Sequence, residues 1–166
     1  MLLLISDANV IIDLEAGGIL ETLFQLPYVF AMPDVLYEEE IEDGSPYLID
    51  MGLKTLVVES LYIDYAITLG EEHGEEPGLY DRLALALAKQ EACPLLTGDN
   101  NLRALAGREG VDIRGTLWVF TEMIEFGLLS NEESLASLDL MKARKRRLPW
   151  DDAKKHIERA NFSSRQ

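Results

Sequence analysis

The chain has 166 residues, 48% hydrophobic and 27% charged, which fits one soluble globular domain. Its single cysteine excludes a disulfide framework and a thiolate metal cage within one chain. No apolar run reaches the roughly 20 residues that span a bilayer, so we expect a cytoplasmic protein with no membrane partner. The net charge of −15 should repel nucleic acid unless metal ions or a basic segment intervene.

Strand and helix patterns alternate along the chain. Leu2–Ser6 is a continuous apolar run, typical of a buried parallel strand, and residues 28–32, 56–58, 93–97 and 111–113 are further predicted strands. Helical spacing covers residues 10–24, with a break at the two glycines 17 and 18, and also residues 33–41 and 60–69. Further helices are predicted at 79–90, 100–108, 117–126, 132–143 and 151–160. This alternation predicts a three-layer α/β/α fold with a central, mostly parallel sheet of four or five strands.

The charge inverts near the C-terminus. Residues 142–166 carry nine basic and three acidic side chains, so the preceding residues are strongly acidic. We therefore predict one domain at residues 1–141 and a basic helical extension at residues 142–166. The basic run 142–147 is compatible with a solvated helix end, with a site for RNA phosphates, or with a segment that folds back onto the acidic body.

Four acidic residues are predicted near the carboxyl ends of strands, where ligands bind in open α/β sheets. Asp7 ends the first strand and Asp99 follows the fourth. Asp81 lies in the first turn of the buried helix 79–90, and Glu38 lies one to two turns after Pro33. Carboxylates that converge without basic partners repel one another, and a divalent cation relieves that repulsion. Oxygen ligands select Mg²⁺ or Mn²⁺.

Each acid also has a simpler interpretation. Asp7 and Asp99 are suited to cap the helices that follow them. Asp81 would favour a helix N-terminus through the macrodipole, and Glu38 belongs to a run of three glutamates typical of a solvated helix face.

Four sequence motifs resemble those of PIN domains, in the same order. They are ISDANVII at residues 5–12, PDVLYE at 33–38, GLYDRLALALA at 78–88 and LLTGDNNL at 95–102. The segment RGTLWV at 114–119 is similar to an element of one prokaryotic PIN subgroup. The resemblance covers roughly residues 1–130.

The resemblance implies a Mg²⁺- or Mn²⁺-dependent endoribonuclease, the toxin of a prokaryotic toxin–antitoxin pair of the VapC-like kind. Asp7, Glu38, Asp81 and Asp99 would then form the acidic metal site, with Glu39 as the alternative to Glu38. Asn9, Thr97 and Asn101 would support it by orienting water or metal ligands, and the substrate would be RNA. Many relatives carry an acid at the position of Asn101, so the resemblance leaves one or two metals open.

The resemblance also implies a homodimer and an antitoxin protein as partners. The aromatic and apolar residues of helix 117–126 are typical of core packing, although they are also suited to a dimer interface. Two other functions remain open. One is a non-catalytic PIN-like interaction module. The other is a phosphatase-like phosphoryl-transfer domain, disfavoured because Asn9 replaces the second aspartate two residues after Asp7.

Overall fold

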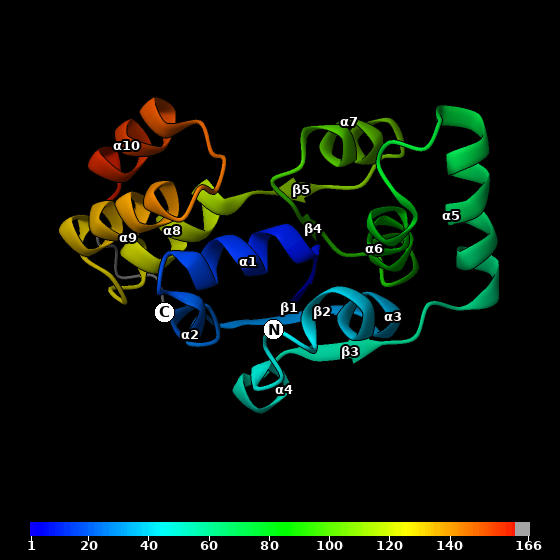
Figure 1. Cartoon of the computed structure of the whole chain (residues 1–166), viewed down its shortest axis with the longest axis horizontal. Coiled ribbons are helices and arrows are strands. Elements are labelled where there is room, and N and C mark those ends of the chain that lie inside the picture. The colour runs from blue at the N-terminus through cyan, green and yellow to red at the C-terminus, as the bar shows by residue number, and fades with distance from the viewer. Residues whose placement is uncertain (162–166) are drawn as a thin grey trace.

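The computed structural model describes residues 1–161 and contains one sheet with helices on both faces (Figure 1). The strands are β1 (Leu2–Ser6), β2 (Tyr28–Pro33), β3 (Lys54–Leu56), β4 (Leu95–Leu96) and β5 (Ile113–Arg114). All neighbouring strands pair in parallel, in the order β3-β2-β1-β4-β5. The predicted three-layer α/β/α fold is confirmed, with five strands.

Helices fill every connection between these strands. Those before β4 are α1 (Ala8–Ala16), α2 (Leu20–Leu23), α3 (Asp34–Leu36), the π-helix η1 (Tyr37–Ile41), α4 (Leu48–Met51), α5 (Ser60–His73) and α6 (Leu79–Gln90). Those after β4 are α7 (Asn100–Arg108), α8 (Thr116–Glu125), α9 (Asn131–Ala143) and α10 (Trp150–Arg159). The short α4 was not predicted from the sequence.

Helix α5 runs one turn further than its sequence pattern indicated. The pattern predicted a helix over residues 60–69, yet the helix continues through Gly70 to His73. A Cβ at Gly70 would lie 2.5 Å from Arg82 Nη2, so the glycine makes room for this buried guanidinium. Glycine is therefore present here for close packing and does not break the helix.

Helix α6 is the central helix of one face. It packs against β1, β2 and β4 and is covered by α5 and α7. Its residues 82–88 are all buried, as the nearly uniform apolar pattern predicted. This packing fixes the N-terminal turn of α6 beside the sheet.

The strand order determines where a ligand would bind. From β1 the chain proceeds outward to β2 and β3 on one side, whereas β4 and β5 lie on the other side. The carboxyl ends of β1 and β4 therefore form a topological switch point, where ligands bind in folds of this class.

The C-terminal segment packs against the rest of the chain. Helix α10 contacts α8 and α9, and Asn131 Nδ2 donates to the carbonyl oxygens of Ile157 and Ala160, at 2.7 and 2.9 Å. The division after residue 141 stays a prediction, and residues 162–166 of the expected extension lie outside the described residues. Within residues 1–161 no helix is both long and apolar enough to cross a bilayer.

Candidate functional site

The candidate site lies at the switch point between β1 and β4. Ser6 pairs with Leu96 in the sheet, and the N–H of Asp7 donates to the Leu96 carbonyl at 3.0 Å. Asp7 and Thr97, each one residue beyond its strand, therefore lie side by side. The structure therefore brings these two candidate site residues together.

Asp7 is fully buried and engages both carboxyl oxygens. Oδ1 accepts from the N–H of Val10 at 3.0 Å, which caps α1, and Oδ2 accepts from the hydroxyl of Thr97. Burial raises the pKa of Asp7 from 3.8 to about 7, against the opposing effect of these hydrogen bonds, and the charge of Asp81 adds to the rise. Each oxygen keeps a lone pair for a further ligand. Capping and ligand binding are thus compatible at Asp7.

The hydroxyl of Thr97 links two of the acidic residues. It donates to Asp7 and accepts from the N–H of Asp99 at 3.1 Å. Asp99 in turn caps α7, because its Oδ1 accepts from the N–H of Leu102 at 2.8 Å. Thr97 is itself fully buried, so it fixes the carboxyl group of Asp7 and the backbone of Asp99 in one rigid arrangement.

Asp81 provides the third carboxylate, from the first turn of α6. It is half-buried, and burial is the main cause that raises its pKa to about 6. The charges of Asp99, Glu40 and Glu76 raise the pKa further. Asp81 is therefore electrostatically coupled to Asp7 and Asp99, as a shared acidic pocket requires.

No cation in the described part of the chain neutralises these acids. Arg82 lowers the pKa of Asp81 slightly, but its buried guanidinium donates to the carbonyl oxygens of Ala66 and Pro77, at 2.9 and 2.7 Å. Among residues 1–161, neither Asp81 nor Asp99 takes part in a salt bridge. The carboxylates thus repel one another, and no salt bridge within residues 1–161 offsets this repulsion at Asp81 or Asp99.

The three consecutive glutamates of η1 point to different places. Glu38 and Glu39 line an open cleft of about 410 Å³ together with apolar residues of β3, α5 and α6. Glu40, in contrast, is the glutamate whose charge raises the pKa of Asp81, and burial raises the pKa of Glu40 itself. Of the three, Glu40 is thus the glutamate whose charge acts on Asp81, whereas the role of Glu38 in the acidic site stays a prediction.

Sequence reasoning missed Glu40, although a signal for it existed. Glu40 follows the buried Leu36 by four residues and the buried Tyr37 by three, so helical spacing places this exposed glutamate on the same side of the helix as those two residues. The π-helical turn was not foreseeable from this pattern. It is marked by the N–H of Glu42 donating to the carbonyl of Tyr37 at 2.8 Å, a five-residue spacing that shifts the register of the helix.

Asn9 and Asn101 lie with Asp99 in a cleft of about 470 Å³ beside the acids. Its opposite wall is formed by the basic segment 145–147. Arg146 anchors this segment, since its Nε lies 2.6 Å from Oδ1 of the buried Asp13. The basic run thus folds back onto the acidic body, which is one of the alternatives that its sequence left open.

The donor chemistry suits a hard divalent cation, because every candidate ligand is a carboxyl, amide or hydroxyl oxygen. Within residues 1–161, however, no three His, Cys, Asp or Glu side chains form a ready-made metal site. The acids are gathered at one edge of the sheet, and a metal would have to draw them closer together.

Comparison with protein families agrees with this geometry. A family model described as a PIN domain (DUF3368) matches residues 3–161. The chain belongs to the PIN-domain family. The match includes α9 and α10 and thus extends past the roughly 130 residues that the sequence motifs covered. A search of curated proteins finds no match.

Proposed function

We propose that this PIN-domain protein is a metal-dependent endoribonuclease whose site comprises Asp7, Asp81 and Asp99, with Glu40 in the place first expected for Glu38. The observation that carries the proposal is the cluster of carboxylates at the switch point, in which Asp81 feels the charges of Asp99 and Glu40 and, within residues 1–161, takes part in no salt bridge. Buried like charges are costly, and proteins keep them chiefly where they act.

The residues of the site would have different roles in hydrolysis. Mg²⁺ or Mn²⁺ would neutralise the phosphate and supply a nucleophilic water at neutral pH. Thr97 holds the Asp7 carboxyl group in a fixed orientation through its hydrogen bond. Asn9 and Asn101 present amide groups in the adjoining cleft, where they are suited to orient water or a phosphate oxygen.

An RNA cleavage assay tests this function. Wild-type protein should cleave single-stranded RNA with Mg²⁺ or Mn²⁺, and EDTA or the substitution Asp81→Asn should abolish cleavage. Because water and not the ribose 2′-hydroxyl is the nucleophile, the fragments should lack 2′,3′-cyclic phosphate ends. Cleavage that survives both EDTA and Asp81→Asn would refute the proposal.

A non-catalytic interaction module is the second candidate. Asn101 contributes no charge, and no three acidic or histidine side chains in residues 1–161 form a ready-made metal site, which favours this alternative. Thermal unfolding with Mn²⁺ separates the two candidates. Mn²⁺ should raise the melting temperature of a protein with a nuclease site, whereas it should leave the melting temperature of a module without metal affinity unchanged.

The biological role that we propose is a toxin neutralised by an antitoxin protein. The nuclease proposal supports this role, since uncontrolled RNA cleavage stops growth. Induced expression of the wild-type chain in a bacterial host should arrest growth, and Asp81→Asn should not. Equal toxicity of the two proteins would contradict the role.

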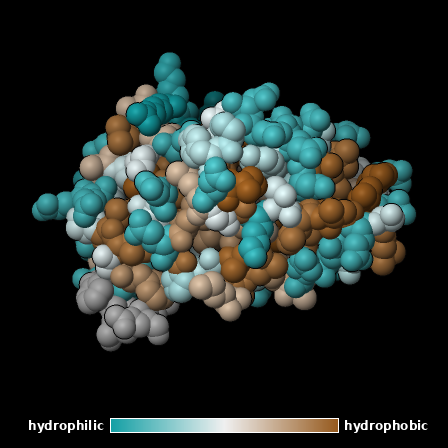
Figure 2. Space-filling model, turned by 90° about the horizontal axis from the view of Figure 1, so that it is seen from below, coloured by the Kyte–Doolittle hydropathy of each residue, from teal (hydrophilic) through white to brown (hydrophobic). Residues whose placement is uncertain are grey.

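We also propose a homodimer through an apolar surface on α5 and on the segment that connects β3 to it. This surface contains Val57, Leu61, Ile63 and Ile67, of which Val57 and Leu61 are 69% and 72% exposed. Figure 2 shows a band of hydrophobic side chains on the face seen from below. Such patches are typical of protein interfaces. The residues of α8 first considered for this role are less suitable, because Phe120 and Met123 are fully buried.

Light scattering after gel filtration tests the dimer. Leu61→Glu should convert the dimer to a monomer, whereas Ile49→Glu should not, since Ile49 is an exposed apolar residue on α4, outside this surface. A monomeric wild type would contradict the dimer.

A further inference from the structure

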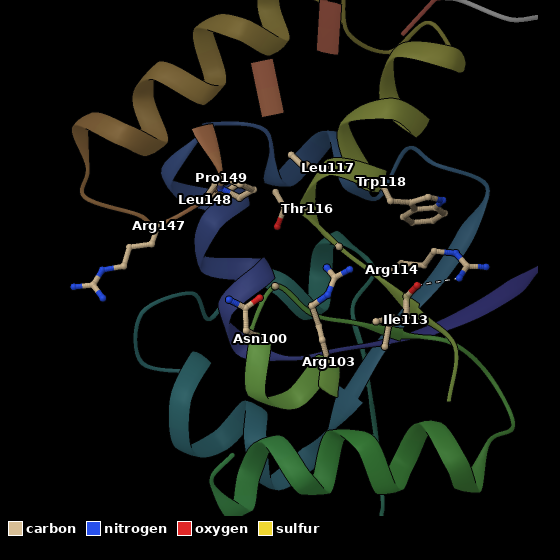
Figure 3. A pocket seen from close by; sticks show the side chains of 12 residues that line it. Asn100, Arg103, Ile113, Arg114, Thr116, Leu117, Trp118, Arg147, Leu148 and Pro149 are labelled. Atoms are coloured by element: carbon tan, nitrogen blue, oxygen red, sulfur yellow. Dashed lines mark hydrogen bonds between the residues drawn. The ribbon is translucent and has the colours of Figure 1, made fainter. Parts of the chain in front are cut away.

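A second cavity, of about 530 Å³, adjoins the acidic site. It lies between the N-terminal half of α7, the segment from β5 to α8, and residues 147–149 (Figure 3). It shares Gly98, Asn100 and Arg147 with the cleft that contains Asp99. A linear polymer bound at the acidic site therefore has a continuous path into this cavity.

The cavity is positively charged in an otherwise acidic protein. Its lining includes Arg103, Arg114 and Arg147 and no acidic residue. The chain as a whole carries a net charge of −15, so the charge of this cavity opposes that of the body. Such a local reversal of charge directs an anionic ligand to one place on the surface.

Arg103 is the central cation of the cavity. Figure 3 shows its side chain pointing inward from α7. It is half-buried, and among residues 1–161 it makes neither a hydrogen bond to a side chain or carbonyl through its guanidinium nor a salt bridge. A Cβ at Gly115 would lie 2.7 Å from Arg103 Nη1, so the missing side chain at this glycine gives the guanidinium its position. A guanidinium held in this way is suited to receive a phosphate.

The remaining wall of the cavity is apolar and aromatic. Trp118, Leu117 and Ile113 line it, with Leu148 and Pro149 on the other side (Figure 3). The Trp118 ring packs against Tyr28 at 5.5 Å between centroids, and the guanidinium of Arg114 lies 6.0 Å from it. The ring is thus fixed while the residue stays half-exposed, so its uncovered part is available for contact with a nucleobase.

We infer that this cavity holds one nucleotide of single-stranded RNA next to the phosphodiester at the acidic site. Arg103 binds its phosphate, and the Trp118 wall receives its base. The inference rests on the proposed nuclease function, because it makes RNA the ligand of the continuous path. The cavity combines an unpaired guanidinium with an aromatic wall, and a nucleotide would use both. An acidic protein chain would use the guanidinium but not the aromatic wall, so a nucleotide is the better ligand.

Binding measurements test the inference without cleavage. In an Asp81→Asn background with Mg²⁺, we would measure the affinity for fluorescent single-stranded RNA and for polyphosphate, which has no base. Arg103→Ala should weaken the binding of both probes about tenfold or more, and should lower the salt dependence of RNA binding by roughly one phosphate contact. Arg108→Ala is the matched control on α7, outside the cavity, and should change neither affinity more than about twofold.

Two further variants separate the parts of the site. Gly115→Ala retains Arg103 but displaces its guanidinium, so it should also weaken both probes. Trp118→Leu should weaken RNA binding and leave polyphosphate binding unchanged, with circular dichroism as the check on folding. Equal RNA affinity of Arg103→Ala and Arg108→Ala would overturn the inference. So would displacement of RNA by polyglutamate at equal charge concentration, which would indicate an acidic protein chain as the ligand.

The outcomes distinguish this inference from the proposed function. If wild-type protein cleaves RNA while Arg103→Ala binds it normally, the function stands and the inference fails. If wild-type protein does not cleave RNA but Arg103→Ala and Trp118→Leu show the expected pattern, the cavity binds a nucleotide and the nuclease proposal fails.

Discussion

Replacing Asp7 by asparagine should stabilise the metal-free protein at pH 8 far more than at pH 5. Asparagine keeps an oxygen for the N–H of Val10, and its amide N–H can donate to the hydroxyl oxygen of Thr97, which reverses the direction of the hydrogen bond between the two side chains. What the substitution removes is a fully buried carboxylate. The variant therefore isolates the free energy of ionising Asp7 inside the protein.

The sign and size of this effect on stability follow from the pKa of Asp7, which burial raises from 3.8 to about 7. Folding favours the neutral form, so the contribution is fully present below pH 3.8 and is lost as the pH rises through about 7. At about 1.36 kcal/mol per pKa unit, the whole shift corresponds to at most about 4 kcal/mol. Of this, about 2–3 kcal/mol is lost between pH 5 and pH 8.

Urea denaturation in EDTA at pH 5 and pH 8 measures the effect. The stability difference between Asp7→Asn and wild type should grow by about 2–3 kcal/mol from the lower to the higher pH. Asp64→Asn is the control, because Asp64 is exposed on α5 and should show no such growth. A change for Asp7→Asn within about 0.5 kcal/mol, the range of ordinary surface substitutions, would refute the reasoning.

Three other predictions concern the metal and the basic segment. Mn²⁺ a hundredfold above its Kd should stabilise wild type by about 2.7 kcal/mol in thermal unfolding, and Asp81→Asn should lose this gain; an equal gain in both would place the metal elsewhere. Calorimetric titration should show that Glu40→Gln weakens Mn²⁺ binding about tenfold while Glu38→Gln does not, and the reverse order would restore Glu38 to the site. Arg146→Ala should lower the free energy of unfolding in urea by about 1–3 kcal/mol, because it removes the cation that pairs with the buried carboxylate of Asp13. The effect should be moderate, since the side chain of Arg146 is itself partly exposed. Unchanged stability would show that the basic segment is held by other contacts.

The sequence was sufficient for the architecture because the hydrophobic patterns are strong and regular. Strand β1 and helix α6 are continuous apolar runs, and both occupy the places predicted for them. The positions of Asp7 and Asp99 followed from the rule that parallel strands end at the same edge of a sheet. Their simpler roles as helix caps were also predictable, and the structure shows that both residues cap.

Three features of the site depend on tertiary contacts that no local pattern contains. The π-helical register of η1, the element that contains Glu40, has no counterpart in the sequence pattern. The position of the basic segment against the acidic body depends on the salt bridge between Arg146 and Asp13, which are 133 residues apart in the sequence. The cavity around Arg103 requires the absence of a side chain at Gly115, whereas in the sequence this glycine was only part of the RGTLWV motif and gave no sign of a cavity.

Anomalous diffraction from crystals grown with Mn²⁺ would test the central claim most directly, because it locates the metal independently of activity. The account predicts one or two Mn²⁺ peaks bounded by the carboxylates of Asp7, Asp81 and Asp99, with Glu40 closer to the metal than Glu38. Metal–oxygen distances should then be roughly 2.0–2.6 Å. A structure at saturating Mn²⁺ with no peak between these acids, or with the metal bound only at another place on the surface, would contradict it.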